Sequence, residues 1–514
     1  MYAGGGNANV AGGGSGAHAA SGGAHAGGTA HHGGSSNAYS NALAEANDLD
    51  ALVFEYGTSK CKFGYAGEDF PRVYESAAPS AYVAGDLPSE RERADAAVAN
   101  AACMEMDPEQ LAQWLFDTSA SRLQTRMSDH PLLFVERPFA LPEEIVALKA
   151  AAGAPSSSVS ESEMKESAAT SSSSVSTKKQ HSKAREQMVE VLMEQLGIPA
   201  LFCAKSAVLT CYANARTSGL VVEMGATYTS VTSVHEGYAF AYPKSQVQVF
   251  GGHDLDAFLR IKLEHQFQSN KTLLLSAPSS PSQEIARRSA SVTASCWSYA
   301  IEAKESGLCR VADTAFDEAQ NAQLPMIQYE LPDKTIIAMG TERFSVPEQY
   351  FISATSPTGA SASESGVASS APSESVVNDF VDGALKKRGL AVPEWICEVG
   401  GMTTEAELRK ELFQNIILTG GSSCFENMPL RLEREVVHAL STYQLPLSGA
   451  SASNGTPFGG NLRVKVIAAH AQERRIGAFL GGSILASLGS FHEMWMSKAE
   501  YAEHGAALVH KKCP

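Results

Sequence analysis

The sequence lacks the features that mark a disulfide-bonded, zinc-binding or nucleic-acid-binding protein. Its nine cysteines are scattered and no C-x-x-C pair occurs, so neither a disulfide framework nor a zinc site is expected, and a reducing compartment fits best. There is no long run of lysine or arginine, and the net charge is −16. Because such a chain is poorly suited to contacting a phosphate backbone, we expect no direct sequence-specific DNA binding.

Long hydrophobic runs are also missing. The longest uncharged apolar stretch near the C-terminus, 476–491, is short for a membrane span and contains four glycines, so it is expected to be a buried helix. The first fifty residues have neither the basic start nor the apolar core of a secretory signal. No membrane association is predicted.

Large apolar side chains are scarce in five segments. Residues 1–50 consist mainly of Gly, Ala, Ser, His and Asn, which predicts a disordered tail. Four internal stretches rich in small residues have the composition of surface insertions: about 150–182, 276–291, 354–375 and 448–461. A fold tolerates such insertions at modest entropic cost.

Between these insertions, short β-branched runs alternate with helical patterns, which predicts an α/β fold. Strands are expected at 51–54 and 219–222. Helices are expected at 185–196, 206–214 and 430–440.

An internal repeat is the most informative pattern. The chain reads A-L-V-F-E-Y-G-T-S-K from residue 51 and G-L-V-V-E-M-G-A-T-Y-T from residue 219. Each copy is an apolar strand, a carboxylate, one further residue, a glycine and then small or hydroxyl side chains. A glycine turn lets backbone N–H groups approach a phosphate closely. Either copy alone could be an ordinary hairpin; the repeat favours a pair of phosphate-binding loops.

The residue types of the repeat suggest roles. The hydroxyls of Thr58, Ser59 and Thr227 could donate to phosphate oxygens, and Lys62 could reach a phosphate as a point charge. Glu55 and Glu223, at the strand ends, could hold the waters around a Mg²⁺.

A third element, N-I-I-L-T-G-G-S-S at 415–423, suits close approach of a nucleoside to the backbone. Taken alone, it is more typical of a plain strand-to-helix turn.

These loops and the segment G-G-S-I-L-A-S-L-G-S-F-H-E-M-W-M-S-K-A-E-Y (481–501) resemble actin and the actin-related proteins. H-P-L-L-F (130–134) and Y-E-L-P-D (329–333) match as well, and the resemblance covers somewhat over half the chain. Within the family, G-Y-A-G-E-D (64–69), A-K-S-A-V-L-T (204–210) and M-G-A-T (224–227) are most similar to the nuclear class four. That class contains the actin-like subunit of chromatin remodelling and histone acetyltransferase complexes.

The resemblance implies an actin-like fold with two α/β lobes around a cleft that holds ATP and Mg²⁺. The first lobe would span 51–214, the second 215–471, and 472–514 would return to the first. Matching positions assign the nucleotide site to the following residues: Gly57, Thr58, Ser59 and Lys62 in the first loop; Gly225, Ala226 and Thr227 in the second; and Gly252, Lys304, Glu305, Gly420, Gly421, Ser422 and Arg475 around the nucleoside.

Several positions depart from the family pattern. Both loop carboxylates are Glu where the family has Asp, and the longer side chains crowd a Mg²⁺. Ser206 stands where actins carry the glutamine that positions the attacking water, and Ala226 replaces an aspartate. Orientation is most of phosphoryl-transfer catalysis, so we expect nucleotide binding with weak or absent hydrolysis. The region 79–130 is shorter than in actins, and together with the insertions this argues against a filament.

The resemblance also implies a partner groove between two hinge elements, 206–214 and 484–491. Its lining would be Tyr212, Ala213, Thr217, Ile484, Leu485 and Leu488, although these residues could equally pack the core. Such a groove accepts an amphipathic helix, here from a remodelling ATPase or an acetyltransferase scaffold. Conventional actin and weakly bound histones are further candidate partners, and the nucleus is the expected location. The alternative is an active ATPase of the actin superfamily, including a divergent filament-forming actin.

Overall fold

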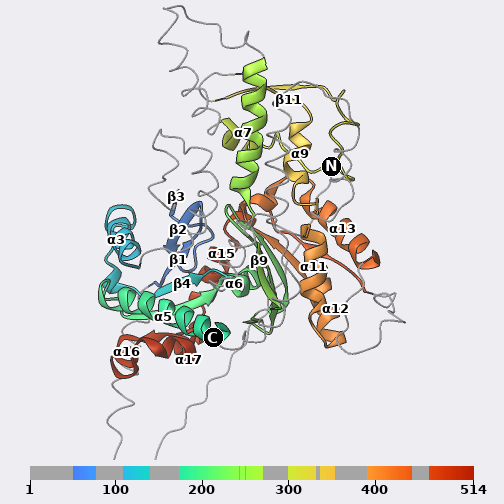
Figure 1. Cartoon of the computed structure of the whole chain (residues 1–514). Helices are drawn as coiled ribbons and strands as arrows, with labels where there is room; N and C mark the ends of the chain where they lie inside the picture. The colour runs from blue at the N-terminus through green and yellow to red at the C-terminus, as the bar shows by residue number, and fades with distance from the viewer. Residues whose placement is uncertain are drawn as a thin grey trace, which may run out of the picture. The chain divides into compact units, whose positions relative to one another are not determined.

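The computed structural model describes residues 50–76, 108–138, 173–241, 243–248, 250–269, 299–331, 336–353, 390–442 and 462–513 (Figure 1). All of them belong to one unit, Glu45–Pro514. The predicted tail, apart from Asp50, lies outside the described residues, as do the predicted insertions at 276–291, 354–375 and 448–461.

The first sheet has six strands in the order β14-β5-β4-β1-β2-β3. Their bounds are β1 Leu52–Tyr56, β2 Lys60–Tyr65, β3 Val73–Ser76, β4 Leu132–Glu136, β5 Ala200–Lys205 and β14 Met496–Ser497. Strand β1 runs parallel to β4 and antiparallel to β2. Because β1 and β4 are buried on both faces, they read as continuous apolar runs rather than as alternating patterns.

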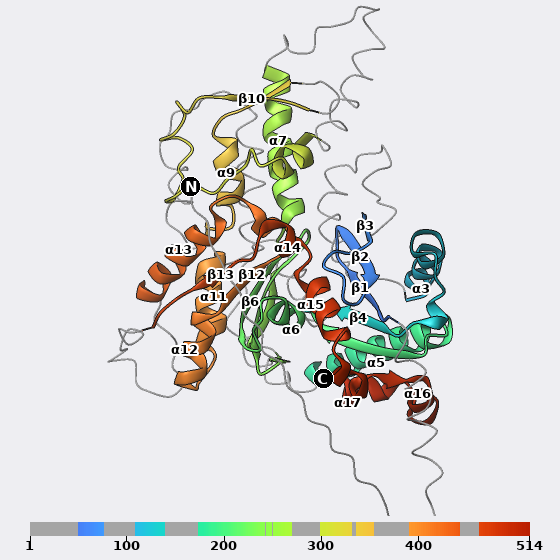
Figure 2. The ribbon, with the colours of Figure 1, turned by 180° about the vertical axis from the view of Figure 1, so that it is seen from behind.

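An aromatic cluster forms the centre of the first core. The ring of Phe54 in β1 lies 5.7 Å from that of Phe63 in β2 and 6.0 Å from that of Phe134 in β4. Trp114, from helix α3 (Pro108–Thr118), stacks at 5.5 Å from Phe54. The helices at the C-terminal end of the chain, α16 (Lys498–His504) and α17 (Val509–Lys512), lie beside helix α5 (Ser173–Glu194) in both views (Figures 1 and 2).

The second sheet repeats the arrangement of the first. Its order is β13-β12-β6-β7-β8, with β9 paired to β7. The bounds are β6 Gly219–Met224, β7 Thr229–His235, β8 Tyr238–Ala239, β9 Ser245–Gln248, β12 Ile416–Thr419 and β13 Val466–Ile467. Strand β6 has a parallel neighbour, β12, and an antiparallel hairpin partner, β7, just as β1 has β4 and β2. The two predicted strands of the repeat are therefore confirmed.

Several helices contact the second sheet, and further helices and one small ribbon lie beyond it, towards the top of Figure 1. The helices are α7 Gly252–Ser269, α9 Glu342–Glu348, α11 Val392–Gly401, α12 Ala406–Gln414, α13 Met428–Thr442 and one at 299–305. The ribbon consists of β10 Ile327–Glu330 and β11 Ile336–Met339. Among the described residues, no helix combines the length and the apolar character needed to cross a bilayer.

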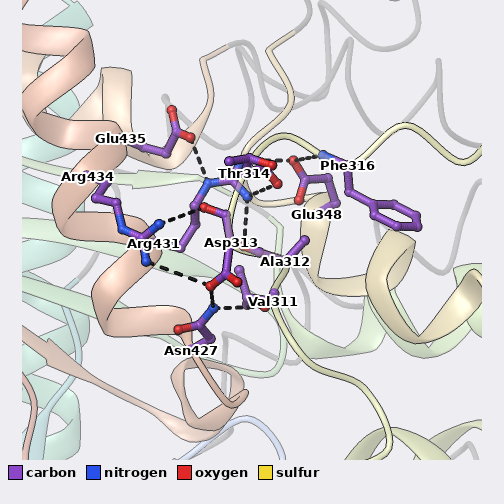
Figure 3. A network of polar contacts seen from close by, with 10 residues as sticks. All are labelled: Val311, Ala312, Asp313, Thr314, Phe316, Glu348, Asn427, Arg431, Arg434 and Glu435. Carbon is purple, nitrogen blue, oxygen red and sulfur yellow. Dashed lines mark hydrogen bonds and ion pairs between the residues drawn. The ribbon is translucent and has the colours of Figure 1, made fainter. Parts of the chain in front are cut away.

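A buried arginine ties the loop 311–316 to α13 and α9 (Figure 3). Arg431 of α13 is almost fully buried and donates to the carbonyl oxygens of Ala312, at 3.0 Å, and Thr314, at 2.5 Å. It also contacts the carboxylates of Glu348, at 3.1 Å, and Glu435, at 2.7 Å. Its donors are thus shared among three separate segments of the chain.

Helices α6 (Ser206–Ala213) and α15 (Gly477–Ala486) pack side by side, and α15 also contacts β1 and β4 (Figure 2). The close approach requires glycine at Gly481, because a Cβ there would overlap the backbone oxygen of Leu209. This pair connects the first sheet, through α15, with the second, through the contact of α6 with β6.

Three helix predictions differ from the structure. The helix expected at 185–196 begins at Ser173, inside the stretch predicted as insertion, because Lys, Gln, Ala and Glu around 178–187 are strong helix formers. The elements expected as one helix at 476–491 and 484–491 are wrong: α15 ends at Ala486, Leu488 is extended, and a 3₁₀ turn, Gly489–Met494, follows. The Ser487 hydroxyl donates to the Ile484 carbonyl at 2.8 Å and satisfies the helix end.

Candidate functional site

The first loop is a tight turn between β1 and β2. A Cβ on Gly57 would overlap the Lys60 carbonyl oxygen, so the turn needs glycine. Glu55 and Lys62 lie opposite each other in the hairpin register, and their side chains form a buried ion pair. The backbone N–H of Phe479 donates to the second Glu55 oxygen at 3.0 Å. Burial opposes the charge of Lys62, but Glu55 more than offsets it, and the pKa of Lys62 is raised.

The second loop is held by the start of α7. The Gly225 N–H donates to the Tyr228 carbonyl at 2.9 Å, and the Gly225 carbonyl accepts from the Gly252 N–H at 3.0 Å. The Ala226 carbonyl accepts from the His253 N–H at 2.8 Å. The loop backbone is therefore held by a hydrogen bond within the loop and by two from the start of α7.

Lys304 joins the same cluster from the helix at 299–305. Its ammonium donates to the Gly252 carbonyl at 2.9 Å and pairs with Asp256 at 2.7 Å. A Cβ on Gly252 would lie 2.8 Å from the Ser422 hydroxyl oxygen, so glycine permits this close packing.

The third element, Gly420–Ser422, lies directly against the second loop. Gly420 has φ = +94°, and a Cβ there would overlap the Met224 backbone, so both conformation and space require glycine. The Ser422 hydroxyl donates to the Gly225 carbonyl at 3.0 Å. Gly421, by contrast, faces open space. The element is a strand followed by a 3₁₀ turn, Gly421–Cys424, and not the start of an α-helix.

The charged side chains of the first loop influence the pKa of the carboxylate in the second. Burial, and next the nearby charge of Glu55, raise the pKa of Glu223, while Lys62 acts to lower it. The Glu223 carboxyl in the second loop is thus within electrostatic reach of both charged side chains of the first.

Two further predicted site residues, Arg475 and Glu305, are charged neighbours of Tyr74 in β3. Burial raises its pKa, and its charged neighbours are Lys62, Arg475, Glu55 and Glu305. The exposed side chains of Arg475 and Glu305 are therefore within electrostatic reach of Tyr74, as are Lys62 and Glu55 of the first loop. Thr58 and Ser59 are half-buried in the first turn, and Thr227 is buried in the second.

Both loop carboxylates already have protein partners. Glu55 binds Lys62 and the Phe479 N–H, and Glu223 accepts from the Ser206 hydroxyl at 3.1 Å and the Tyr228 hydroxyl at 3.4 Å. Within the described ranges, no group of three or more His, Cys, Asp or Glu side chains is arranged to hold a metal ion. Direct metal ligation does not fit these residues, and the water-mediated Mg²⁺ role of Glu55 and Glu223 stays a prediction.

One residue of the site carried no sequence signal. Arg137 follows β4 by one position, stacks 4.0 Å over the Tyr56 ring and donates from Nε to the Tyr56 carbonyl at 2.8 Å. The only available hint was topological: ligand sites gather at the carboxyl ends of parallel strands, and Arg137 lies at that end of β4.

The predicted partner groove is partly exposed. The side chains of Ile484 and Leu488 are 39% and 48% exposed, so they do not merely pack the core. Tyr212, Ala213 and Leu485 are half-buried, and Thr217 is exposed.

A separate hollow of about 450 Å³ is lined by Tyr65, Glu68, Arg72 and His130, among others. It lies at the end of the β1–β2 hairpin remote from Gly57, since Leu52 pairs with Tyr65. Arg72 is engaged by Glu68 there, so the hollow offers no free cation for a phosphate.

Comparison with known proteins agrees with this geometry. A family model described as Actin matches residues 165–514. Actin-related protein 4 of Oryza sativa subsp. indica is 31% identical over 507 residues, which cover 91% of this chain and 99% of the rice protein. Actin-related protein 4 of Arabidopsis thaliana is 30% identical over 338 residues, which cover 64% of this chain and 68% of that protein. The chain belongs to the actin family.

Proposed function

We propose that this chain binds ATP between its two glycine loops and serves as a nuclear, non-polymerising actin-related subunit of a chromatin remodelling or histone acetyltransferase complex. Actin-family folds are generally nucleotide-binding. The relatives named Actin-related protein 4 support the assignment to that class. The observation that carries the proposal is the packing of the second glycine loop at Gly225 against Gly252 and Ser422, residues that the sequence assigned to one nucleotide site.

The residues of the two loops fit a polyphosphate. In the proposal, the backbone of Gly57 and the hydroxyls of Thr58, Ser59 and Thr227 donate to phosphate oxygens, and the turn at Gly225 lets the second loop approach them closely. Lys304, Glu305, Arg475 and the Gly420–Ser422 element would hold the nucleoside. A bound triphosphate would supply the negative charge that links both loops. If Mg²⁺ accompanies it, the contact to Glu55 and Glu223 runs through water.

Weak or absent hydrolysis follows from the same residues. The Ser206 hydroxyl donates to Glu223 at 3.1 Å, so its proton is already committed, and Ala226 has no carboxylate. Ser206 is shorter than glutamine and has no donor left for a water, and Ala226 has no polar group, so both are poorly suited to orient a water for in-line attack; orientation is worth several orders of magnitude in such reactions. This disfavours the alternative of an active ATPase.

For the partner, we propose a single amphipathic helix laid across Ile484, Leu485 and Leu488 beside Tyr212, Ala213 and Thr217. Exposed Ile484 and Leu488 would supply the apolar anchors. A helical segment of a remodelling ATPase or acetyltransferase scaffold is the expected occupant. Conventional actin could share that helix, and histones could bind weakly to the acidic surface.

Two measurements test the proposal. Purified full-length protein should bind ATP by calorimetry yet release phosphate at no more than a slow background rate; sustained turnover would support the ATPase alternative. Affinity purification from nuclei should recover a remodelling ATPase or an acetyltransferase scaffold. Recovery in cytoplasmic filaments would contradict the proposed role.

A further inference from the structure

The side chain of Arg137 carries an unsatisfied charge. It is only 7% exposed, and its Nε is bound to the Tyr56 carbonyl at 2.8 Å. Its Nη1 atom is buried and makes no hydrogen bond to any described residue. Burying a polar group without a partner costs free energy, and burying a charge costs more. An unpartnered buried donor such as this one therefore suggests a ligand-binding position.

The neighbouring side chains do not neutralise this charge. Burial is the main influence on Arg137 and lowers its pKa; the acidic neighbours are Tyr228, Tyr56, Cys61 and Glu223. Burial raises the pKa of Cys61 to about 12 and that of Tyr228 well above its usual value, so both are neutral at physiological pH. A guanidinium stays protonated under the same conditions.

Glu223 does not complete the pair either. Its two oxygens accept from Ser206 and Tyr228, and no ion pair joins it to Arg137 in the described chain. The pKa of Glu223 is itself raised, first by burial, so its negative charge is disfavoured.

Arg137 contacts the first loop through Tyr56 and is within electrostatic reach of the second. Tyr56 immediately precedes the first turn at Gly57, whereas Glu223 and Tyr228 flank the second turn at Gly225. Since β4 runs parallel to β1, Arg137 also lies at the carboxyl ends of these strands, where the first loop begins. An anion held by both loops would come within reach of the guanidinium.

We propose that Arg137 is a phosphate ligand, binding the terminal phosphate of a nucleotide held between the loops. The proposal rests on the nucleotide-binding function proposed above. Lys62 is already paired with Glu55, so Arg137 is the cation with donors to spare. A guanidinium binds phosphate through two parallel N–H bonds, which are stronger than neutral hydrogen bonds. With this charge in place, the site depends less on a divalent cation for the terminal phosphate.

The test measures binding of ATP, ADP and AMP to the full-length protein, each with Mg²⁺ and with EDTA. Arg137→Met should weaken ATP binding about 10- to 100-fold, as expected for lost charge-assisted hydrogen bonds, while AMP binding changes by less than about twofold. Arg137→Lys keeps the charge and should give an intermediate loss. The wild type should retain measurable ATP binding in EDTA.

The matched control is Arg343→Met. Arg343 is also buried and lies over an aromatic ring, Phe344 at 5.2 Å, but donates to the carbonyls of Gly340 and Pro325, away from the loops. It should leave the ratio of ATP to AMP affinity unchanged. Thermal unfolding of each variant without nucleotide separates loss of the fold from loss of the contact.

Three results would overturn the inference: unchanged ATP affinity in Arg137→Met, an equal loss for ATP and AMP, or the same selective loss in Arg343→Met. If Arg137→Met does not fold, the selectivity of Arg137→Lys decides in the same way. A wild-type protein that binds none of the three nucleotides would instead contradict the proposed function. Failure of the Arg137 inference and failure of the proposed nucleotide binding therefore give different results.

Discussion

At the scale of single residues, the buried carboxylate of Glu136 makes the most testable contribution to stability. It pairs with Arg185 and Lys205, and although burial would raise its pKa, the two cations more than offset this and the pKa of Glu136 is lowered. A lowered carboxyl pKa contributes stability above the unfolded value, near 4.3, and loses it as the pH falls further.

Glu136→Gln should therefore lower the free energy of unfolding by about 3 kcal/mol at pH 7, because it leaves two cations without their anion. The difference should shrink as the pH falls below about 4. Urea unfolding at several pH values measures both. Glu407→Gln, which breaks the exposed pair with Lys410, is the control and should change stability by less than about 0.5 kcal/mol. A loss for Glu136→Gln that is independent of pH would contradict the electrostatic explanation.

Glu223 should behave in the opposite way. Its pKa is raised, first by burial and then by Glu55, so the folded state holds its proton more tightly than the unfolded state. Stability from this group is present at low pH and is lost as the pH rises through the raised pKa.

We expect Glu223→Gln to stabilise the protein at pH 8, by about 1 kcal/mol, and to have little effect near pH 4. Thermal unfolding without nucleotide at both pH values measures the difference. The exposed Glu493→Gln serves as the reference substitution. Destabilisation at pH 8 would mean that the hydrogen bonds from Ser206 and Tyr228 require the charged carboxylate.

Some site residues could be predicted from a sequence pattern, whereas others depend on how the strands pair. Glu55 was singled out because the repeat places a carboxylate and a glycine at fixed spacing after an apolar strand, and its role beside Mg²⁺ stays a prediction. Lys62 was expected to reach a phosphate, but its ammonium is paired with Glu55 in the structure. Arg137 was missed because its role depends on which strand pairs with β1, which only the folded sheet determines. The orphaned Nη1 of Arg137 is likewise a property of packing and has no sequence signature.

At the scale of elements, the crossing of α6 and α15 depends on one glycine. A Cβ on Gly481 would overlap the Leu209 backbone oxygen, whereas Gly489, just beyond the helix, has nothing within 4 Å of its Cβ position. Gly481→Ala should destabilise by about 2 kcal/mol or more, since backbone must move, and Gly489→Ala by less than about 0.5 kcal/mol. If both substitutions lower the free energy of unfolding equally in chemical denaturation, the crossing of α6 and α15 does not depend on the missing Cβ of Gly481.

The Arg431 network in Figure 3 predicts a local effect. Arg431→Met removes the bonds to Ala312 and Thr314 and leaves Glu348 buried without its cation, so the loop 311–316 should open. Limited proteolysis should cut this loop about tenfold faster than in the wild type. Arg434→Met, which loses only exposed contacts to Asp313, is the control. An unchanged cleavage rate in Arg431→Met would contradict the idea that Arg431 holds the loop 311–316 in place.

Helix existence was predicted more reliably than helix ends. Apolar periodicity found the helix now described as α13, because its buried face repeats every three to four residues, whereas the predicted α6 is buried along most of its length. It failed at α15, where the helix is buried nearly all round and carries no periodicity, and its end is set by Ser487. The start of α5 was hidden because serine-rich composition masks a helix that neighbouring good helix formers sustain.

At the scale of the whole molecule, ATP should act as a structural ligand. A ligand at 100 times its dissociation constant stabilises the state that binds it by about 2.7 kcal/mol. Because the described part of the chain is larger than about 250 residues, each kcal/mol moves the midpoint by less than about 2 °C, and the unfolding midpoint should rise by about 3 to 5 °C. AMP at the same molar concentration lacks the phosphates that contact both loops, should bind more weakly and therefore shift the midpoint less, and is the control for nucleoside binding. No shift with ATP, or no detectable ATP binding, would contradict the proposed nucleotide site.

The strand β14 has a consequence for how the molecule is made. It completes the first sheet by pairing Met496 with Leu201, and the Cys203 N–H donates to the Cys513 sulfur, 310 positions later, at 3.3 Å. All strands of the second sheet, in contrast, lie between Gly219 and Ile467. During translation the second sheet can therefore assemble while β5 still presents an unpaired apolar edge, and such edges recruit chaperones or aggregate. Slowing synthesis after residue 467 should prolong this vulnerable interval.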